Sequence, residues 1–200
     1  MVPVLSWLFL KGRCRYCRAP VSIQYPAVEL LTASAFLLCL LAKGPGMESA
    51  LMCMFSSILI TAAFIDARHM YIPDGIHILI LLLSCISLAA GSGPAIINRL
   101  GGSLLAGGFL ALVNLLSRGG VGWGDVKLFA ASGLLIGAAP AITALLMGYV
   151  AAGLWYAVPL VRGRVGRKTQ IPMAPFFAVS LMVCGLWFRQ LFLWYLGFFR

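Results

Sequence analysis

Charge is scarce in this sequence, and acidic charge is the scarcest of all. Only 10% of the 200 residues are charged, against roughly a quarter in a soluble domain, and only five residues are Asp or Glu. Apolar residues make up 62% of the chain, and the mean hydropathy is +1.01. This composition excludes an ordinary soluble domain and predicts a polytopic membrane protein.

Other features are also missing from the sequence. It has no polar linker, no low-complexity tract, no repeat with a period of about 20–50 residues, and no recognisable cleavable signal peptide. Apolar runs follow one another through short connectors, so we expect a single folded domain. The net charge of +10 would suit a nucleic-acid-binding protein. The basic residues, however, cluster in the connectors, which indicates membrane topology and no nucleic-acid partner.

The apolar runs predict an all-α protein with about seven transmembrane helices. These runs are 27–42, 50–65, 76–90, 100–116, 126–139, 141–161 and a last run that ends at 199. With the N-terminus inside, eleven of the fifteen Lys and Arg residues fall on the cytoplasmic side. That excess agrees with the positive-inside rule and supports the layout.

Small residues are concentrated at the start of the fourth run. Gly102 and Ala106, and likewise Ser103 and Gly107, form small-x-x-x-small pairs. Such pairs allow the backbones of neighbouring membrane helices to approach closely. We therefore expect this part of the fourth helix to pack tightly against another helix.

Among six cysteines, only Cys14 and Cys17 have the spacing of metal ligands. They lie in a basic loop that we expect in the cytoplasm. A Cys-x-x-Cys supplies half of a tetrahedral zinc site, and no second pair occurs in the sequence. The alternatives are therefore a zinc site and a dithiol that is reduced, structural or intermolecular.

The three aspartates all fall at predicted cytoplasmic helix ends. Asp74 follows Pro73, and we expect it to cap the next helix. Asp66 ends an apolar helix, where the helix dipole favours a cation, so it needs a partner or a function. Asp125 follows the glycine-rich segment 119–124 between two apolar runs, where a carboxylate is costly and indicates a functional site. The alternative for Asp125 is a turn in which it caps the following helix.

Two carboxylates that converge at the edge of a bilayer can perform acid–base chemistry. In such a pair, one ionised carboxylate removes a proton from water while its protonated neighbour donates to the carbonyl under attack. Lys127 either holds a carboxylate charged or anchors the helix at the interface. Asp66 and Asp125 therefore favour an aspartyl hydrolase. A small transporter or assembly subunit is the alternative, but it would place charges near the middle of the bilayer rather than at its rim.

Five ordered motifs make the sequence similar to the type IV prepilin peptidases, also called prepilin leader peptidases, over nearly its whole length. The matching stretches are Gly122–Leu128, Ile65–Asp66 with Ile72–Asp74, Pro3–Leu8, Gly12–Cys17 with Ile23–Glu29, and Ile171–Phe176. The resemblance implies an integral-membrane aspartic peptidase of the Gly-x-Gly-Asp type. By that resemblance, Asp66 and Asp125 are the catalytic pair, and Asp74, Gly122, Gly124 and Lys127 belong to the supporting motifs.

The resemblance also implies a substrate and a location. The family removes a basic leader from type IV prepilins or pseudopilins, after a glycine and before a hydrophobic segment, for pilus assembly or type II secretion. We expect a multi-pass protein in the inner membrane of a bacterium, in contact with the lipid bilayer and with the active site facing the cytoplasm. Residues 1–26 would form a cytoplasmic segment with a remnant cysteine loop, and residues 27–200 the transmembrane aspartic peptidase domain.

The resemblance is to a short form of the family. Longer members carry a further N-terminal span and a first Cys-x-x-Cys ahead of the stretch where this sequence starts. That region is linked to the zinc site and to methylation of the new N-terminus with S-adenosylmethionine. We therefore expect proteolysis without a cofactor, and zinc and S-adenosylmethionine belong to an alternative, bifunctional interpretation. A presenilin-like intramembrane protease, which also uses Gly-x-Gly-Asp, is a further alternative.

Overall fold

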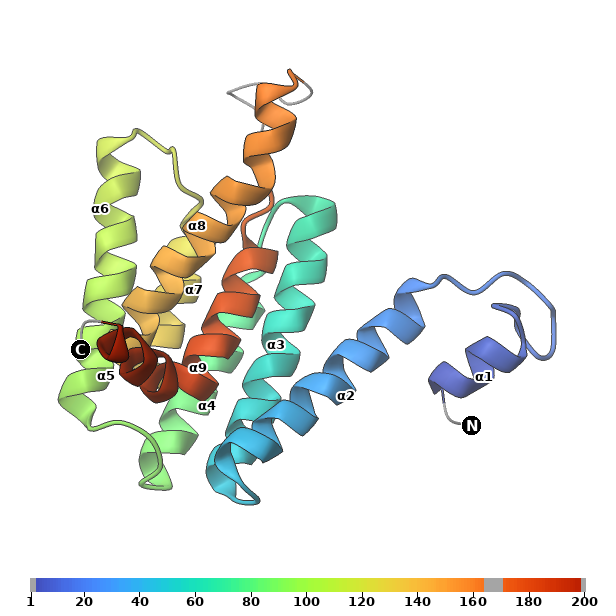
Figure 1. The fold of residues 1–200 in the computed structure, drawn as a ribbon, viewed down its shortest axis with the longest axis horizontal. Helices are drawn as coiled ribbons and strands as arrows, with labels where there is room; N and C mark the ends of the chain where they lie inside the picture. Colours follow the sequence, from blue (N-terminus) through green and yellow to red (C-terminus); the bar gives the residue numbers. More distant parts are fainter. Residues whose placement is uncertain (1–2, 164–170, 199–200) are drawn as a thin grey trace.

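The computed structural model describes residues 3–163 and 171–198, and within them the chain is a bundle of helices with no named strand (Figure 1). The elements in order are α1 (Pro3–Phe9), α2 (Gln24–Lys43), α3 (Met47–His69), α4 (Asp74–Ala89), α5 (Ile96–Gly102), the π-helix η1 (Ser103–Gly107), α6 (Gly108–Leu116), α7 (Trp123–Ile136), α8 (Ala138–Val161) and α9 (Ala174–Gly197). The prediction of an all-α fold is confirmed.

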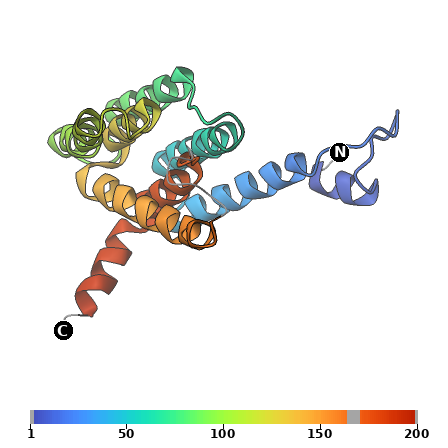
Figure 2. The same ribbon diagram turned by 90° about the horizontal axis from the view of Figure 1, so that it is seen from above.

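Helices α3 to α9 form the main body, and the two ends of the chain leave it. α9 packs against α3 and α8, while α7 packs against α4 and η1. α2 packs on α3 at one end and diverges from it at the other, so that α1 stands away from the body (Figures 1 and 2). α9 breaks at Trp187, where φ is −124° and ψ is 18°. Beyond this break its last turns leave the bundle (Figure 2).

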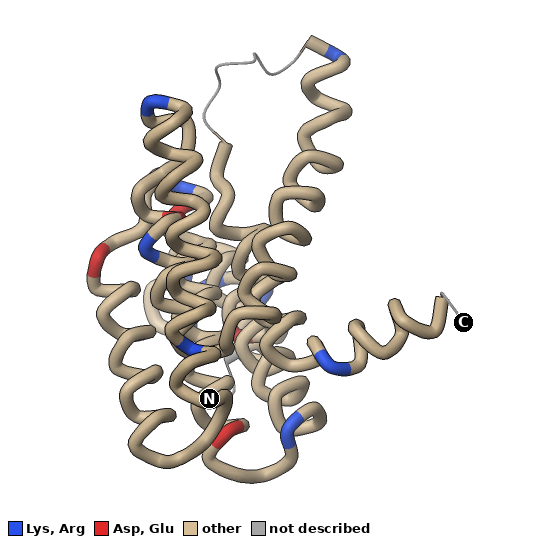
Figure 3. Tube along the Cα trace, turned by 90° about the vertical axis from the view of Figure 1, so that its left-hand side faces the viewer, with Lys and Arg blue, Asp and Glu red and all other residues tan. Residues whose placement is uncertain are grey.

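Five of the described helical segments are long and apolar enough to cross a membrane: α2, α3, the continuous segment Ile96–Leu116, α8 and α9. Figure 3 shows the long uncharged stretches along the helices. α4 is a shorter apolar helix, and α7 has only 14 residues. At about 1.5 Å per residue, α7 spans roughly 21 Å of a hydrocarbon core about 30 Å thick. A membrane protein is therefore confirmed, whereas seven complete spans remain a prediction.

The boundary between the fifth and sixth predicted helices differs from the expectation. The apolar runs 126–139 and 141–161 predict Pro140, which lies between them, as the boundary, but Gly137 separates α7 from α8, with φ of 90°. Pro140 instead lies in the first turn of α8. Proline is tolerated there because the first N–H groups of a helix have no partner within it.

The predicted close packing of the fourth helix is confirmed, and its partner is α7. A Cβ atom added to Gly102 would lie 2.5 Å from the carbonyl oxygen of Gly133. A Cβ atom added to Gly107 would lie 2.6 Å from that of Ala130. The backbones of the two helices therefore touch directly, and α7, despite its shortness, is buried along most of its length.

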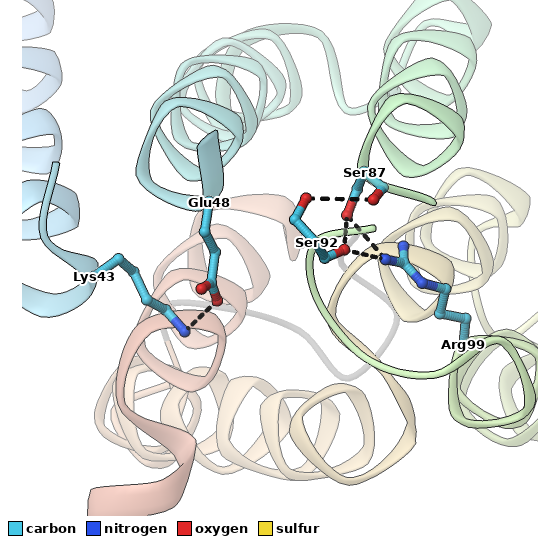
Figure 4. Close-up of polar contacts among 5 residues, drawn as sticks. All are labelled: Lys43, Glu48, Ser87, Ser92 and Arg99. Atoms are coloured by element: carbon cyan, nitrogen blue, oxygen red, sulfur yellow. Dashed lines mark hydrogen bonds and ion pairs between the residues drawn. The ribbon is translucent and has the colours of Figure 1, made fainter. Parts of the chain in front are cut away.

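A buried arginine holds the end of the bundle at which α7 finishes. Arg99, which is 4% exposed, donates hydrogen bonds to the oxygens of Pro94 (2.8 Å) and Leu134 (3.2 Å). It also donates to Ser87 Oγ (2.9 Å) and to the carbonyl oxygen of Ser92 (2.5 Å), as seen in Figure 4. One guanidinium group thus joins α4, the 90–95 loop, α5 and α7.

The contact between Gly102 and α7 predicts a difference between two neighbouring glycines. Gly102→Ala should lower the melting temperature of the protein in detergent by several degrees, since overpacking costs about 1–3 kcal/mol. Gly101→Ala is the matched control, because its Cβ would lie 3.6 Å from that of Ala138, which is ordinary contact. Equal melting temperatures for the two variants would contradict the close approach.

Candidate active site

All three aspartates lie at one end of the bundle. Asp66 lies in the last turns of α3, Asp74 is the first residue of α4, and Asp125 lies in the first turn of α7. α9 begins at this end as well. The carboxylates of Asp66 and Asp125 are close enough to interact electrostatically. The structure therefore brings together the two residues that the sequence singled out.

Asp66 meets the N-terminus of α9. Its side chain is buried, at 7% exposed, and its Oδ2 accepts a hydrogen bond of 2.9 Å from the backbone N–H of Ala174. A helix N-terminus carries partial positive charge and unpaired N–H groups, both of which favour a carboxylate. The misfit of an acid at the C-terminal end of α3 is thus compensated by another helix. The hydrogen-bond donor to Asp66, the N–H of Ala174, belongs to the motif at residues 171–176.

Asp125 lies beside two glycines, Gly122 and Gly124, at which a side chain would crowd neighbouring atoms. A Cβ atom on Gly122 would lie 3.2 Å from Asp125 Oδ2, so the missing side chain keeps the space next to this carboxylate open. A Cβ atom on Gly124 would lie 3.3 Å from that of Ile72, which packs on this turn. Gly122 is the N-cap residue of α7, and no side chain caps the helix. The alternative that Asp125 serves as a cap is therefore wrong.

An aromatic cluster adjoins Asp125 from the side of α8 and α9. Tyr149 lies close enough to Asp125 for an electrostatic interaction between the two side chains. The ring of Tyr149 packs edge-on against that of Phe177, with 5.2 Å between the ring centroids. Phe177 in turn meets Phe129 edge-on at 4.9 Å. Gly148 permits this approach, because a Cβ there would lie 2.5 Å from the Phe177 ring. The sequence reasoning missed Tyr149, for which the available signal was a phenolic hydroxyl within an apolar run.

Asp74 forms an ion pair across the site instead of capping α4. Its Oδ1 lies 2.7 Å from Lys127 Nζ, and both side chains are exposed to solvent. The expectation that Asp74 caps the helix is wrong, because Pro73 is the N-cap residue and no side-chain cap bond forms. Lys127 thus pairs with Asp74 and joins α4 to α7. An exposed pair of this kind stabilises a protein by only about 0.2–1 kcal/mol, so its main effect is on geometry.

His77 supports the turn that carries Asp125, and sequence reasoning missed it. The ring is buried, with Nε2 3.1 Å from the carbonyl oxygen of Gly124 and Nδ1 3.5 Å from Asp74 Oδ1. Since a carbonyl can only accept, Nε2 carries the proton in this contact. The signal was a histidine within an apolar run, where a titratable side chain is costly.

The glycine-rich segment before α7 is held by Asn114 near the end of α6. In the amide orientation that satisfies both neighbours, Asn114 donates to the carbonyl oxygen of Val121 (2.8 Å) and accepts from Trp123 Nε1 (3.2 Å). Asn114 is itself buried, at 3% exposed. Both ends of the turn that presents Asp125 are therefore fixed by side chains from neighbouring helices.

The cysteine loop lies apart from the aspartates, between α1 and α2. Cys14 and Cys17 are free thiols, and among the described residues no group of three or more His, Cys, Asp and Glu side chains gathers to hold a metal. Two thiols do not complete a four-ligand zinc site. Hydrogen bonds from the backbone of Cys17 and Tyr16 hold the pKa of the Cys14 thiol below its usual value. The loop thus favours the thiolate form of Cys14.

This lowered pKa predicts how Cys14 reacts with an alkylating agent. The iodoacetamide rate at Cys14, followed by peptide mass spectrometry, should rise at lower pH in the native protein than in the urea-unfolded one. The reason is that folding increases the thiolate fraction, and the thiolate is the nucleophile. Identical pH profiles in the two states would show that the loop does not act on this thiol.

Comparison with known families shows what each part of the chain is similar to. Residues 1–43 match the model described as "Bacterial Peptidase A24 N-terminal domain", and residues 53–157 match the "Type IV leader peptidase family". The second match contains Asp66, Asp74 and Asp125, together with α7 and most of α8. The chain has no match among solved structures.

Curated relatives extend the similarity over most of the chain. A "Prepilin leader peptidase/N-methyltransferase" of Aeromonas hydrophila is 34% identical over 98% of this chain and 69% of its own length. A protein of Bacillus subtilis with the same name is 32% identical over 94% of this chain and 75% of its own length. A "Type 4 prepilin-like proteins leader peptide-processing enzyme" of Escherichia coli is 37% identical over 87% of this chain and 65% of its own length. With the family match across the aspartate-bearing helices, these similarities show that the chain belongs to the type IV leader peptidase family.

Proposed function

We propose that the chain is a membrane aspartic endopeptidase that removes the basic leader from type IV prepilins or pseudopilins, with Asp66 and Asp125 as its catalytic pair. The observation that carries the proposal is the meeting of these two carboxylates at one end of an apolar bundle. Membership of the type IV leader peptidase family supports the substrate class. The other acid at this end, Asp74, is engaged by Lys127 and is not part of the pair.

The pair acts through one shared proton. The ionised carboxylate takes a proton from water, the resulting hydroxide attacks the scissile carbonyl carbon, and the protonated carboxyl donates its proton to the carbonyl oxygen. Collapse of the tetrahedral intermediate breaks the C–N bond, and a proton from the pair goes to the leaving amine. The Ala174 N–H and the positive end of the α9 dipole favour negative charge on Asp66. Asp66 is therefore assigned as the base and Asp125 as the acid.

The position of the site suits a substrate with a basic leader and a hydrophobic segment. The hydrophobic segment stays in the bilayer while the charged leader remains in water, so the bond between them lies at the interface. The proposed pair lies at helix ends, at the same level. Gly122 leaves open space beside Asp125, which suits the close approach of a substrate backbone at a bond that follows a glycine.

The proposed topology has seven spans in the inner membrane of a bacterium, with the aspartates facing the cytoplasm. The excess of Lys and Arg in the connectors at the aspartate end supports this orientation. The cytoplasmic orientation also suits the proposed substrate. The basic leader of a prepilin would lie on the cytoplasmic side, which is the side on which Asp66 and Asp125 would then be exposed.

A bifunctional enzyme is the second candidate. The names of the Aeromonas hydrophila and Bacillus subtilis relatives include an N-methyltransferase. Such an enzyme would also methylate the new N-terminus with S-adenosylmethionine. The residues at the aspartate end account for cleavage alone, and methyl transfer is therefore a separate question.

The proposed pair predicts the effect of three substitutions. Asp66→Asn and Asp125→Asn should each lower the rate of leader cleavage at least about a hundredfold, the contribution of one acid–base group. Asp74→Asn should have a milder effect, since it loses only an exposed ion pair. The measurement is cleavage of a prepilin in detergent, read by the loss of the leader on a gel.

Glu48→Gln, at the opposite end of the bundle, is the control for the removal of an acid. It should cleave at the rate of the wild type, and all four variants should insert into membranes. Substantial cleavage by either Asp66→Asn or Asp125→Asn would disprove the proposed pair.

Cleavage should also proceed without a cofactor. Chelation of zinc and omission of S-adenosylmethionine should leave the cleavage rate unchanged, because the proposed steps use only water and two carboxyl groups. Mass spectrometry of the mature product from reactions with S-adenosylmethionine would report methyl transfer independently. A cleavage rate that falls with the chelator would require a metal in the peptidase reaction.

A further inference from the structure

The end of the bundle opposite the aspartates contains a cavity of about 420 Å³. This volume lies within the range of about 300–1,000 Å³ that is typical of small-molecule sites. Its wall comes from the ends of α2 and α7, the start of α3, the loop after α4 and the middle of α9. The break of α9 at Trp187 turns the last turns of this helix outward and leaves Arg189 at the rim.

The cavity has an excess of positive charge. Lys43 on its wall is neutralised by Glu48, at 2.8 Å, but Arg189 has no ion-pair or hydrogen-bond partner within residues 3–163 and 171–198. Arg99 lies directly behind the wall, where its hydrogen bonds go to carbonyl and hydroxyl oxygens of the protein. In the described part of the chain no carboxylate pairs with it. Figure 4 shows the Lys43–Glu48 pair on one side and the Arg99 cluster on the other.

Ser87 places the Arg99 guanidinium group next to the cavity wall. Its hydroxyl accepts from Arg99 Nη2 (2.9 Å) and donates to the carbonyl oxygen of Ser92 (2.6 Å), and Ser87 itself lines the cavity. The charge of Arg99, which no carboxylate of the described residues neutralises, adds positive potential at this wall of the cavity. The rim and one wall therefore both favour an anion.

The floor of the cavity is apolar, with Leu51, Met52, Leu135 and Ile136 among its residues. A small soluble anion gains no binding free energy from contact with an apolar surface. An amphiphile can bury an acyl chain against this surface and keep its head group at the charged rim. Basic pockets between membrane helices bind anionic lipid head groups on the cytoplasmic or matrix side of other proteins, and this cavity combines the same two features, basic charge and an apolar wall, at the opposite end of the bundle. From the charge and the floor together, we propose that this cavity binds the phosphate head group of an anionic phospholipid, with Arg189 as its main contact.

Two substitutions test the site from different directions. Arg189→Gln removes the free charge at the rim. Gly185→Leu fills the cavity, and it should fold because a Cβ at Gly185 would make only ordinary contacts with Ile136 (3.5 Å) and Met52 (3.7 Å). Arg162→Gln, at the exposed end of α8 on the other side of the bundle, removes the same charge from the whole protein and serves as the matched control.

The full chain is purified in an uncharged maltoside detergent, and its melting temperature is followed during titration with dioleoyl phosphatidylglycerol or dioleoyl phosphatidylcholine. We expect phosphatidylglycerol to raise the melting temperature by several degrees more than phosphatidylcholine, because a ligand that binds only the folded state stabilises it. Arg189→Gln should raise the half-saturating concentration about tenfold, as for one lost charge-assisted hydrogen bond. Gly185→Leu should abolish the difference between the two lipids, and Arg162→Gln should preserve it.

Equal phosphatidylglycerol titrations for the wild type, Arg189→Gln and Gly185→Leu would overturn the site. Glycerol 3-phosphate, at the same concentration of phosphate, distinguishes the source of the anion. No shift with it supports a lipid, and a full shift would overturn the lipid assignment in favour of a soluble phosphate ester. None of these measurements depends on peptide cleavage, so they stand or fall independently of the proposed peptidase.

Discussion

The hydrogen bond from the Ala174 N–H to Asp66 is the contact on which the arrangement at the aspartate end depends. It joins the last turns of α3 to the first turn of α9, two segments more than a hundred residues apart in the chain. An acid is unfavourable at a helix C-terminus and favourable at an N-terminus, so each helix end compensates the other. The start of α9 then brings Phe177 against Phe129 and Tyr149, which form the apolar side of the region around Asp125.

α7 presents a related problem, because it is too short to reach both surfaces of a bilayer and its C-terminal end is buried in the protein. Terminal N–H and carbonyl groups of a buried helix need partners. At the end of α7, Arg99 donates to the carbonyl oxygen of Leu134, one of these terminal carbonyls. At its start, His77 contacts the carbonyl oxygen of Gly124 and joins the first turn to α4. Between these two points the Gly102 and Gly133 backbones touch. Asp125 is thus carried by a helix that is fixed at both ends and along one side, which suits a carboxylate that must keep its position.

The sequence was sufficient to predict the helices and the common end of the three aspartates, because apolar runs and connector charges determine both. It could not identify the contacts between distant segments. Charge counting places Arg99 among the four Lys and Arg residues that lie outside the cytoplasmic connectors, but it is buried and supports α7. The local pattern predicts Asp74 as a helix cap, but its side chain binds Lys127. Charge counts and local patterns say which residues are near a helix end, but they do not say which neighbouring helix contributes the partner. His77 and Tyr149 were missed for the same reason, since their roles depend on helix packing.

The pairing of Lys127 with Asp74 has a consequence for the proposed chemistry. A shared proton requires that one carboxyl of the pair stays neutral, and a free ammonium group nearby would favour ionisation of both. Lys127 lies two positions after Asp125 on α7, so the two side chains point in different directions on the helix. Its ammonium group is held 2.7 Å from Asp74, on α4, where its charge is compensated by an acid outside the pair. Under the proposed mechanism, Asp74 would support Asp66 and Asp125 without contact with substrate, because its ion pair holds Lys127, the cation of the α7 motif, away from the proton that the pair has to share.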